Sequence, residues 1–158
     1  MKPLPSTSES GLPRVRLASS DDISPMMDIA RQTRTAAEWT ETQYRAVFNS
    51  NSPRRLAWLV MDAKVVGFLV VRVLDREWEI ENIAVSTKLQ RGGYGRQLIS
   101  EMIHTARTEN AKLIFLEVRE SNLKARAFYE KHGFRESGRR KGYYNDPVEE
   151  AILYQLVV

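Results

Sequence analysis

The residues with the clearest chemical potential are the glycines at positions 92, 93 and 95, flanked by Arg91 and Arg96. Glycines let successive backbone N–H groups point at one spot, and the two guanidinium groups add positive charge. An alternating apolar run precedes this turn, and a segment with helical periodicity follows it, so a helix N-terminus would add its partial positive charge. The pattern predicts a turn that binds phosphate or pyrophosphate, although a glycine-rich turn can also be only a tight connection.

Two common phosphate-binding motifs fit this turn poorly. A P-loop needs a lysine directly after its glycines, and none follows Gly95. A dinucleotide-binding fingerprint shares Gly93 and Gly95, but Leu98 stands where its third glycine belongs. The chain also lacks the repeated strand and helix units of the dinucleotide-binding fold. Nucleoside triphosphate chemistry and dinucleotide binding are therefore both poor interpretations of this turn.

Glu117 and Tyr129 are further candidates for chemistry. Glu117 interrupts the apolar run of residues 112–118, which is typical of a central strand covered on both faces. A carboxylate there must be paired, or desolvation must raise its pKa, which makes a base suited to neutral pH. The alternative is a glutamate at a frayed strand end that pairs with Arg119. Tyr129, taken alone, is most often a core aromatic whose hydroxyl lies at the edge of the core.

Two more carboxylates lie on the strand predicted for residues 79–85. Strict alternation places Glu79 and Glu81 on the same side as Ile83 and Val85. Carboxylates on such a half-buried face could attract a cationic amine, or they could simply be solvated at the end of the strand. The sequence leaves these two interpretations open.

Composition limits the classes of function. The chain has 158 residues, enough for one domain with a real core, and its formal net charge of +4 is modest. It has no cysteine and only two histidines, so a metal centre or a Ser-His-Asp hydrolase is poorly supported. Residues 139–147 place basic side chains beside aromatic ones, but one such patch is a weak indication of nucleic-acid binding. We therefore predict no metal and no direct nucleic-acid partner.

Periodicity and turn residues predict one domain over residues 14–158, after a disordered leader at residues 1–13 that is rich in Pro, Ser, Thr and Glu. No apolar run approaches the length of a membrane span, and the first residues lack the apolar centre of a signal peptide. A cytoplasmic protein without a membrane partner is predicted. The predicted strands cover residues 14–17, 56–61, 65–74, 79–85, 112–118, 134–140 and 151–157, with helices after Asp22, Thr40, Gly95 and Asn122.

Four stretches of the chain, in this order, resemble the GCN5-related N-acetyltransferases (GNAT). They are Asn-Ile-Ala-Val at residues 82–85, Gln-Arg-Gly-Gly-Tyr-Gly at 90–95, and the segments 116–122 and 127–134. The segment 138–151 is similar, within that superfamily, to the ribosomal-protein-alanine N-acetyltransferases of the RimI type. The resemblance covers nearly all of the predicted domain.

The resemblance implies an α/β (α+β) fold with a mixed, mostly antiparallel sheet of about six to seven strands and about four flanking helices. The sheet would splay open between the strands that end near Val85 and Glu117, and acetyl-CoA, the cosubstrate, would lie in the opening. Its pantetheine would pair with the backbone of one strand, and its pyrophosphate would lie on the glycine-rich turn. The cofactor-binding residues implied are Ile83, Ala84, Val85, Arg91, Gly92, Gly93, Tyr94, Gly95, Arg96 and Asn122.

The reaction implied is acetyl transfer to the N-terminal α-amine of a protein, with ribosomal protein S18 as the natural acceptor. Glu117 would be the proton acceptor and Tyr129 the proton donor. An acetyltransferase for a small amine or a lysine, and a non-catalytic acyl-CoA-binding module, remain alternatives. The loop that helps to form the acceptor groove departs from the family pattern, because it reads Ala-Glu-Trp-Thr at residues 37–40 where Pro-Trp-Ser is common.

Overall fold

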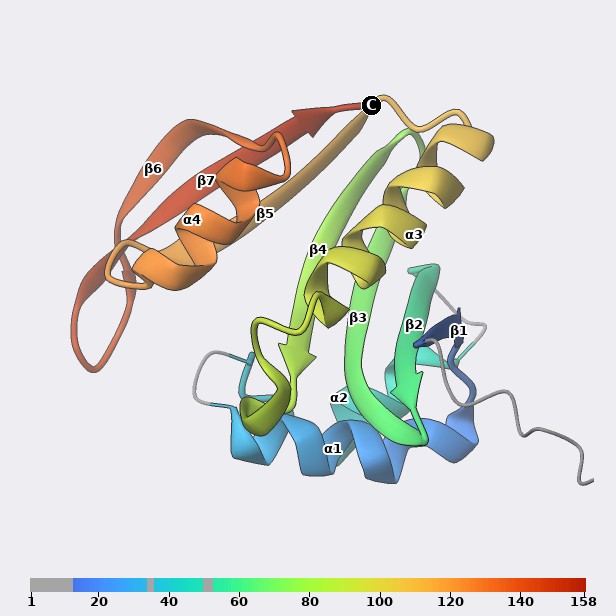
Figure 1. Ribbon diagram of the computed structural model, residues 1–158. Coiled ribbons are helices and arrows are strands. Elements are labelled where there is room, and N and C mark those ends of the chain that lie inside the picture. The colour runs from blue at the N-terminus through green and yellow to red at the C-terminus, as the bar shows by residue number, and fades with distance from the viewer. Residues whose placement is uncertain (1–12, 34–35, 50–52) are drawn as a thin grey trace, which may run out of the picture.

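The computed structural model describes residues 13–33, 36–49 and 53–158, and all but the last residue of the predicted leader lies outside them. The described chain contains seven strands, four α-helices and two short 3₁₀ turns (Figure 1). In chain order these are β1 (Arg14–Leu17), η1 (Ser20–Asp22), α1 (Ile23–Gln32), α2 (Glu41–Val47), β2 (Arg55–Asp62), β3 (Lys64–Leu74), β4 (Glu77–Val85), η2 (Thr87–Leu89), α3 (Tyr94–Thr108), β5 (Leu113–Arg119), α4 (Leu123–Lys131), β6 (Arg135–Tyr144) and β7 (Glu149–Val157).

The strands form one mixed sheet in the order β1-β2-β3-β4-β5-β7-β6. Neighbouring strands are antiparallel except β4 and β5, which are parallel. The β4–β5 ladder is short, because it runs only from the pair Glu77–Leu113 to the pair Glu79–Phe115. Beyond it the two strands separate toward their C-terminal ends (Figure 1). The sheet therefore splays where the sequence predicted it would.

Apolar side chains build one core on each face of the sheet. Trp58, Leu98 and Ile114 belong to the larger core, which lies beneath α3 and α4. Met26 and Phe68 belong to the second core, which lies beneath α1 and α2. Figure 1 shows α3 across one face of β2, β3 and β4, with α1 and α2 on the other side. The larger core contains buried residues of both β4 and β5, so it supports both edges of the opening between them.

Strand β4 contains a β-bulge that the sequence pattern did not predict. Ile80 pairs with Val71 and Asn82 pairs with Val70, so Glu81 is an extra residue on β4. A bulge of this kind reverses the side on which the following side chains project. Alternation therefore holds before Glu81 and after it, but not across it.

The bulge corrects the prediction that four side chains share one side of β4. Ile83 and Val85 pack against the α3 core, which also contains Trp78. Glu79 is the neighbour of Trp78 and so projects to the opposite face. Glu81 also forms its ion pairs on that face. The acidic and the apolar side chains of β4 therefore lie on opposite sides of the sheet.

Strand β5 is not covered on both faces, which corrects a second prediction. Ile114, Leu116 and Val118 are buried beneath α3 and α4, whereas the residues between them are only half-buried. Helices α1 and α2 pack on β2, β3 and β4 and leave this face of β5 open. Glu117 therefore lies on a half-buried polar face rather than inside an apolar layer.

The basic and aromatic segment near the C-terminus belongs to a hairpin. Strand β6 extends to Tyr144, beyond its predicted end. The Arg139 guanidinium lies within ion-pair distance of the carboxylates of Glu120, Glu136 and Glu150. These ion pairs engage the Arg139 charge within the chain, and the absence of direct nucleic-acid binding stays a prediction.

Candidate active site

The glycine-rich turn joins the end of β4 to the first turn of α3. Gly93 precedes the helix with φ of 84°, and Arg91 adopts φ of 73°. The first intrahelical hydrogen bond runs from Gln97 N to Gly93 O at 3.1 Å. By helix geometry, the N–H groups of residues 94–96 have no acceptor within the helix. The turn therefore presents backbone donors and the positive end of the α3 dipole at one spot, as predicted from the sequence.

Three different physical constraints require the three glycines. Gly93 needs the left-handed backbone conformation. A Cβ on Gly92 would lie 2.7 Å from Cε2 of Tyr94, and a Cβ on Gly95 would lie 3.2 Å from Cζ of Phe128 on α4. Gly95 thus allows α3 and α4 to approach closely beside the turn.

Two side-chain hydrogen bonds hold this turn in place. The Tyr94 phenol donates to Oδ2 of Asp62, at the end of β2, over 2.6 Å. This hydrogen bond raises the pKa of Tyr94 above its ordinary value. Gln90 Nε2 donates to the Val85 carbonyl over 3.3 Å. The turn is therefore tied both to the β2–β3 connection and to the end of β4.

The charges at this turn are available to a ligand. Arg91 and Arg96 are both exposed, and neither forms an ion pair with any described residue. By contrast, Arg55 and Arg72 on the sheet are held by carboxylates. An anion at the turn would therefore meet two guanidinium groups that need not be released from other partners.

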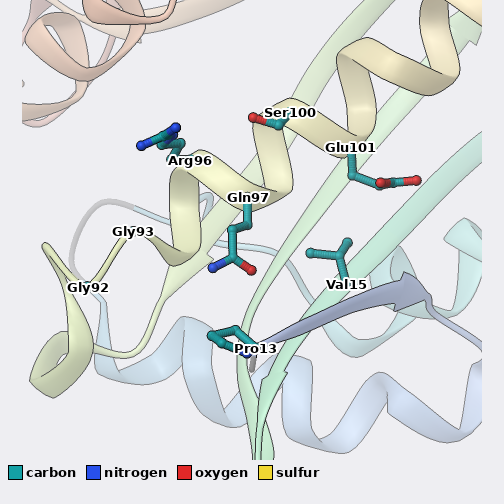
Figure 2. Close-up of a pocket in the computed structure, with 8 residues that line it drawn as sticks. All are labelled: Pro13, Val15, Gly92, Gly93, Arg96, Gln97, Ser100 and Glu101. Atoms are coloured by element: carbon teal, nitrogen blue, oxygen red, sulfur yellow. The ribbon is translucent and has the colours of Figure 1, made fainter. Parts of the chain in front are cut away.

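A cavity of about 690 Å³ borders the turn on its β1 side. Gly92, Gly93 and Arg96 form one wall, and Pro13 and Val15 lie opposite (Figure 2). Gln97, Ser100 and Glu101 of α3 complete the lining. The space beside the predicted phosphate site is thus large enough for a bulky group attached to a phosphate.

The opening between β4 and β5 leaves one edge of β4 without a strand partner. Ile83, Ala84 and Val85 pair on their other edge with residues 67–69 of β3. On the β5 side, no described strand pairs with these three residues. The Val85 carbonyl accepts a hydrogen bond from Gln90 Nε2, and backbone groups on this edge that have no such bond require a partner from solvent or from a bound molecule. The edge can therefore hydrogen-bond an extended ligand.

Glu117 is paired, but not with the residue predicted. Its Oε1 lies 3.1 Å from Nη2 of Arg140, and its side chain is 15% exposed. The charge of Glu117, together with a hydrogen bond to it, raises the pKa of Tyr143. Arg119 instead pairs with Glu149 at 3.3 Å, so the predicted Glu117–Arg119 pair is wrong. Arg140 and Tyr143 were missed as partners because they lie far along the chain, within the C-terminal resemblance.

The other two carboxylates on this face form a compact network with arginines. Arg55 donates to Glu81 through Nε at 2.7 Å and through Nη2 at 3.2 Å. Arg72 donates to Glu79 and lies 3.8 Å from Glu81. Glu79 and Glu81 are therefore paired with arginines rather than solvated at a strand end, which contradicts one interpretation, whereas attraction of a cationic amine stays a prediction.

Tyr129 lies in the larger core, on the opposite side of the sheet from Glu117. Its ring makes edge contacts with Phe128 and Phe134, with centroid distances of 5.4 and 5.5 Å. Burial raises its pKa well above the ordinary value for a phenol. The phenol is therefore protonated across the neutral range, which suits a proton donor and excludes a role as a base.

Asn122 caps α4, as its position before the helix predicted. Its Oδ1 accepts a hydrogen bond from Ala125 N at 3.2 Å. This capping bond orients the side chain beside the separated end of β5. Its predicted contact with a cofactor remains a prediction.

Two classes of site are not seen in the described part of the chain. Within residues 13–33, 36–49 and 53–158, no group of three or more His, Cys, Asp or Glu side chains is placed to hold a metal ion. No helix in these same ranges is both long enough and apolar enough to cross a bilayer.

Residues 23–134 match the Acetyltransferase (GNAT) family. The chain belongs to this family. It is 35% identical over 127 residues to the [ribosomal protein bS18]-alanine N-acetyltransferase of Escherichia coli, an alignment that covers 78% of this chain and 83% of the relative. It is 31% identical over 147 residues to the Salmonella typhimurium enzyme of the same name, with coverage of 91% and 97%.

A solved structure shows the same architecture. The crystal structure of the ribosomal-protein-S18-alanine N-acetyltransferase from Escherichia coli superimposes on this GNAT chain with a TM-score of 0.83 at 28% identity. The superposition covers 93% of this chain and 94% of the other. The GNAT fold predicted from the sequence, with its mixed and splayed sheet, is therefore confirmed.

Proposed function

We propose that this GNAT chain transfers the acetyl group of acetyl-CoA to the N-terminal α-amine of a protein, with ribosomal protein S18 as the acceptor. The observation that carries the proposal is the three-pair β4–β5 ladder, which opens the sheet directly beside a phosphate-binding turn. The relatives named above act on the alanine of ribosomal protein S18. The proposal includes the predicted cytoplasmic location, because ribosomal proteins are synthesised there.

The residues of the opening fit acetyl-CoA. The unpaired edge of Ile83, Ala84 and Val85 offers backbone partners to the amides of pantetheine. The turn over residues 91–96 offers to the pyrophosphate its N–H groups and two guanidinium groups that form no ion pair with the described part of the chain. Asn122 would contact the cosubstrate from the N-terminus of α4. Bound acetyl-CoA supplies the activated thioester on which the reaction depends.

The two predicted catalytic residues approach the opening from opposite faces of the sheet. Glu117 projects to the α1 and α2 side, and Tyr129 belongs to the core beneath α3 and α4. An acceptor ammonium on the first side would lose a proton to Glu117, directly or through water. The free amine then forms a bond to the thioester carbon as the carbon–sulfur bond breaks, and the nitrogen releases its second proton to water, from which Tyr129 would regain the proton that it gives up. Tyr129 would donate a proton to the departing thiolate, giving acetylated amine and CoA thiol.

The acceptor is the part of the proposal that most needs a direct test. We would measure CoA release from acetyl-CoA with a short peptide that copies the N-terminus of S18. A control peptide has a blocked N-terminus and an internal lysine. Turnover only with the free N-terminus is the expected result. Turnover with small amines alone, or with the lysine alone, would mean that the acceptor is that amine and not a protein N-terminus. Acetyl-CoA binding without turnover on any amine would indicate a non-catalytic binding module.

Replacing both Arg91 and Arg96 with glutamine is expected to weaken acetyl-CoA binding. Exposed charge pairs contribute about 0.2–1 kcal/mol each, so the double variant should raise the Kd by about tenfold at low salt. The difference from wild type should shrink as salt screens the charges. Titration calorimetry at two salt concentrations measures both effects. Arg107→Gln, at the far end of the same helix, is the matched control, and an equal effect there would contradict a local phosphate site.

A further inference from the structure

Asn82 is one of the few polar side chains that the fold buries, and it joins two parts of the site. It is 3% exposed. Its Oδ1 accepts a hydrogen bond from the backbone N–H of Ala37 at 3.1 Å, and its Nδ2 lies 3.5 Å from the Tyr44 hydroxyl. The backbone N–H can only donate, so it fixes the orientation of the amide. Asn82 thus bridges β4 and the connection between α1 and α2.

The β-bulge at Glu81 is what allows this bridge. Without the extra residue, Asn82 would continue the alternation of Trp78 and Ile80 and project into the core beneath α3. With it, Asn82 projects toward α1 and α2 instead. The next residue, Ile83, begins the unpaired edge that we assign to pantetheine. A single strand segment therefore carries both the cosubstrate edge and the anchor of the connecting loop.

The connection between α1 and α2 has little else that ties it to the sheet. Among its described residues, 36–40, the hydrogen bond from Ala37 to Asn82 is the one that reaches a strand. Trp39 packs edge-on against Tyr44, at 5.4 Å between ring centroids, and Tyr44 packs in the same way on Phe68. These ring contacts hold the side chain of Trp39 against the second core. The hydrogen bond to Asn82 instead holds the backbone of the loop at Ala37.

We propose that Asn82 is a positioning residue that couples the cosubstrate strand to the acceptor loop and so sets the affinity for the acceptor amine. The inference rests on the proposed function, because it takes β4 as the cosubstrate edge and residues 36–40 as part of the acceptor groove. Acetyl-CoA paired to the β4 backbone would restrain Asn82, and the hydrogen bond to Asn82 would in turn restrain the backbone at Ala37. Loss of the amide should loosen the loop without changing the cosubstrate site.

The test is Asn82→Ala, assayed with the S18 peptide. Losing a hydrogen bond to a buried backbone N–H should raise the peptide KM by about tenfold, while the Kd for acetyl-CoA stays within about twofold. Asn82→Asp keeps the accepting oxygen and should recover part of the peptide affinity. Thr33→Val is the matched control, because Thr33 is also buried, and among the described residues its hydroxyl donates to the Ile29 and Ala30 carbonyls of α1 rather than to a strand or loop.

Hydrogen–deuterium exchange provides a second readout that needs no acceptor. In the wild-type protein, acetyl-CoA should slow exchange in residues 36–49, and this protection should disappear in Asn82→Ala. An unchanged peptide KM together with retained protection in Asn82→Ala would overturn the proposal. An equal loss of affinity for the peptide and for acetyl-CoA would also overturn it, because it would indicate a general folding defect. Absence of any acetyl-CoA binding by the wild-type protein would instead overturn the proposed function.

Discussion

Replacing Glu117 with glutamine is expected to lower kcat by about 10³-fold and to leave the Kd for acetyl-CoA within about twofold. Glutamine keeps the size of the side chain and can still accept a hydrogen bond from Arg140, but it cannot take a proton from the incoming ammonium. Glu117 lies on the face of the sheet opposite α3, whose N-terminus forms the predicted phosphate-binding turn. Cosubstrate binding should therefore survive a substitution that removes the proton acceptor.

The measurement is a single-turnover assay with saturating S18 peptide, because it reports the chemical step rather than CoA release. Glu79→Gln is the matched control. Glu79 projects to the same face, carries the same charge and, like Glu117, is paired with an arginine, so it controls for the loss of a paired carboxylate on this face. We expect Glu79→Gln to keep its single-turnover rate. A wild-type rate in Glu117→Gln would remove Glu117 from the mechanism, and a large loss in Glu79→Gln would mean that the two carboxylates act together.

Features that depend on neighbours in the chain were predictable from the sequence. The turn over residues 91–96 is one, because its glycines, arginines and following helix lie within a few positions of each other. The caps at Thr40 and Asn122 are others, since a side chain bonds a backbone group three residues away. The splayed sheet was predicted by family resemblance rather than by periodicity.

Features that depend on distant partners were not predictable in this way. The bulge at Glu81 comes from the register between β3 and β4, and no turn residue or glycine marks it in β4. Because strict alternation takes no account of this bulge, it assigned Ile83 to the wrong face of the sheet. For the same reason it did not predict the contact between Asn82 and the α1–α2 connection. The partner of Glu117 was missed for the same reason, because Arg140 lies on a hairpin that β7 brings back beside β5.

The apolar run in β5 misled for a different physical reason. The run of residues 112–118 was predicted to be a strand buried on both faces, yet only the face beneath α3 and α4 is covered. On the other face Phe115 and Glu117 are only partly buried, and Figure 1 shows no helix over this side of β5. Apolar side chains beside a ligand opening resemble core residues in sequence, because a bound ligand would cover the first as the core covers the second.

Replacing Tyr129 with phenylalanine is expected to lower kcat by about 10²-fold, again with little change in the Kd for acetyl-CoA. Phenylalanine keeps the edge contacts with Phe128 and Phe134, so the core should remain packed. Tyr154→Phe is the matched control. That phenol is also buried, but it donates to Glu130 and accepts from Arg126, so its loss should lower stability rather than kcat.

The pH dependence of kcat provides the sharper test of Tyr129. Burial raises the pKa of this phenol, and a phenol is a proton donor only below its pKa. Wild-type kcat should therefore show no decline from Tyr129 as the pH is raised through about 10, the ordinary value for tyrosine. The loss in Tyr129→Phe should then be the same at neutral pH as at pH 9. A decline in wild-type kcat at or below the ordinary tyrosine pKa, if it is absent from Tyr129→Phe, would contradict a buried donor. It would mean that the phenol ionises as freely as one in water.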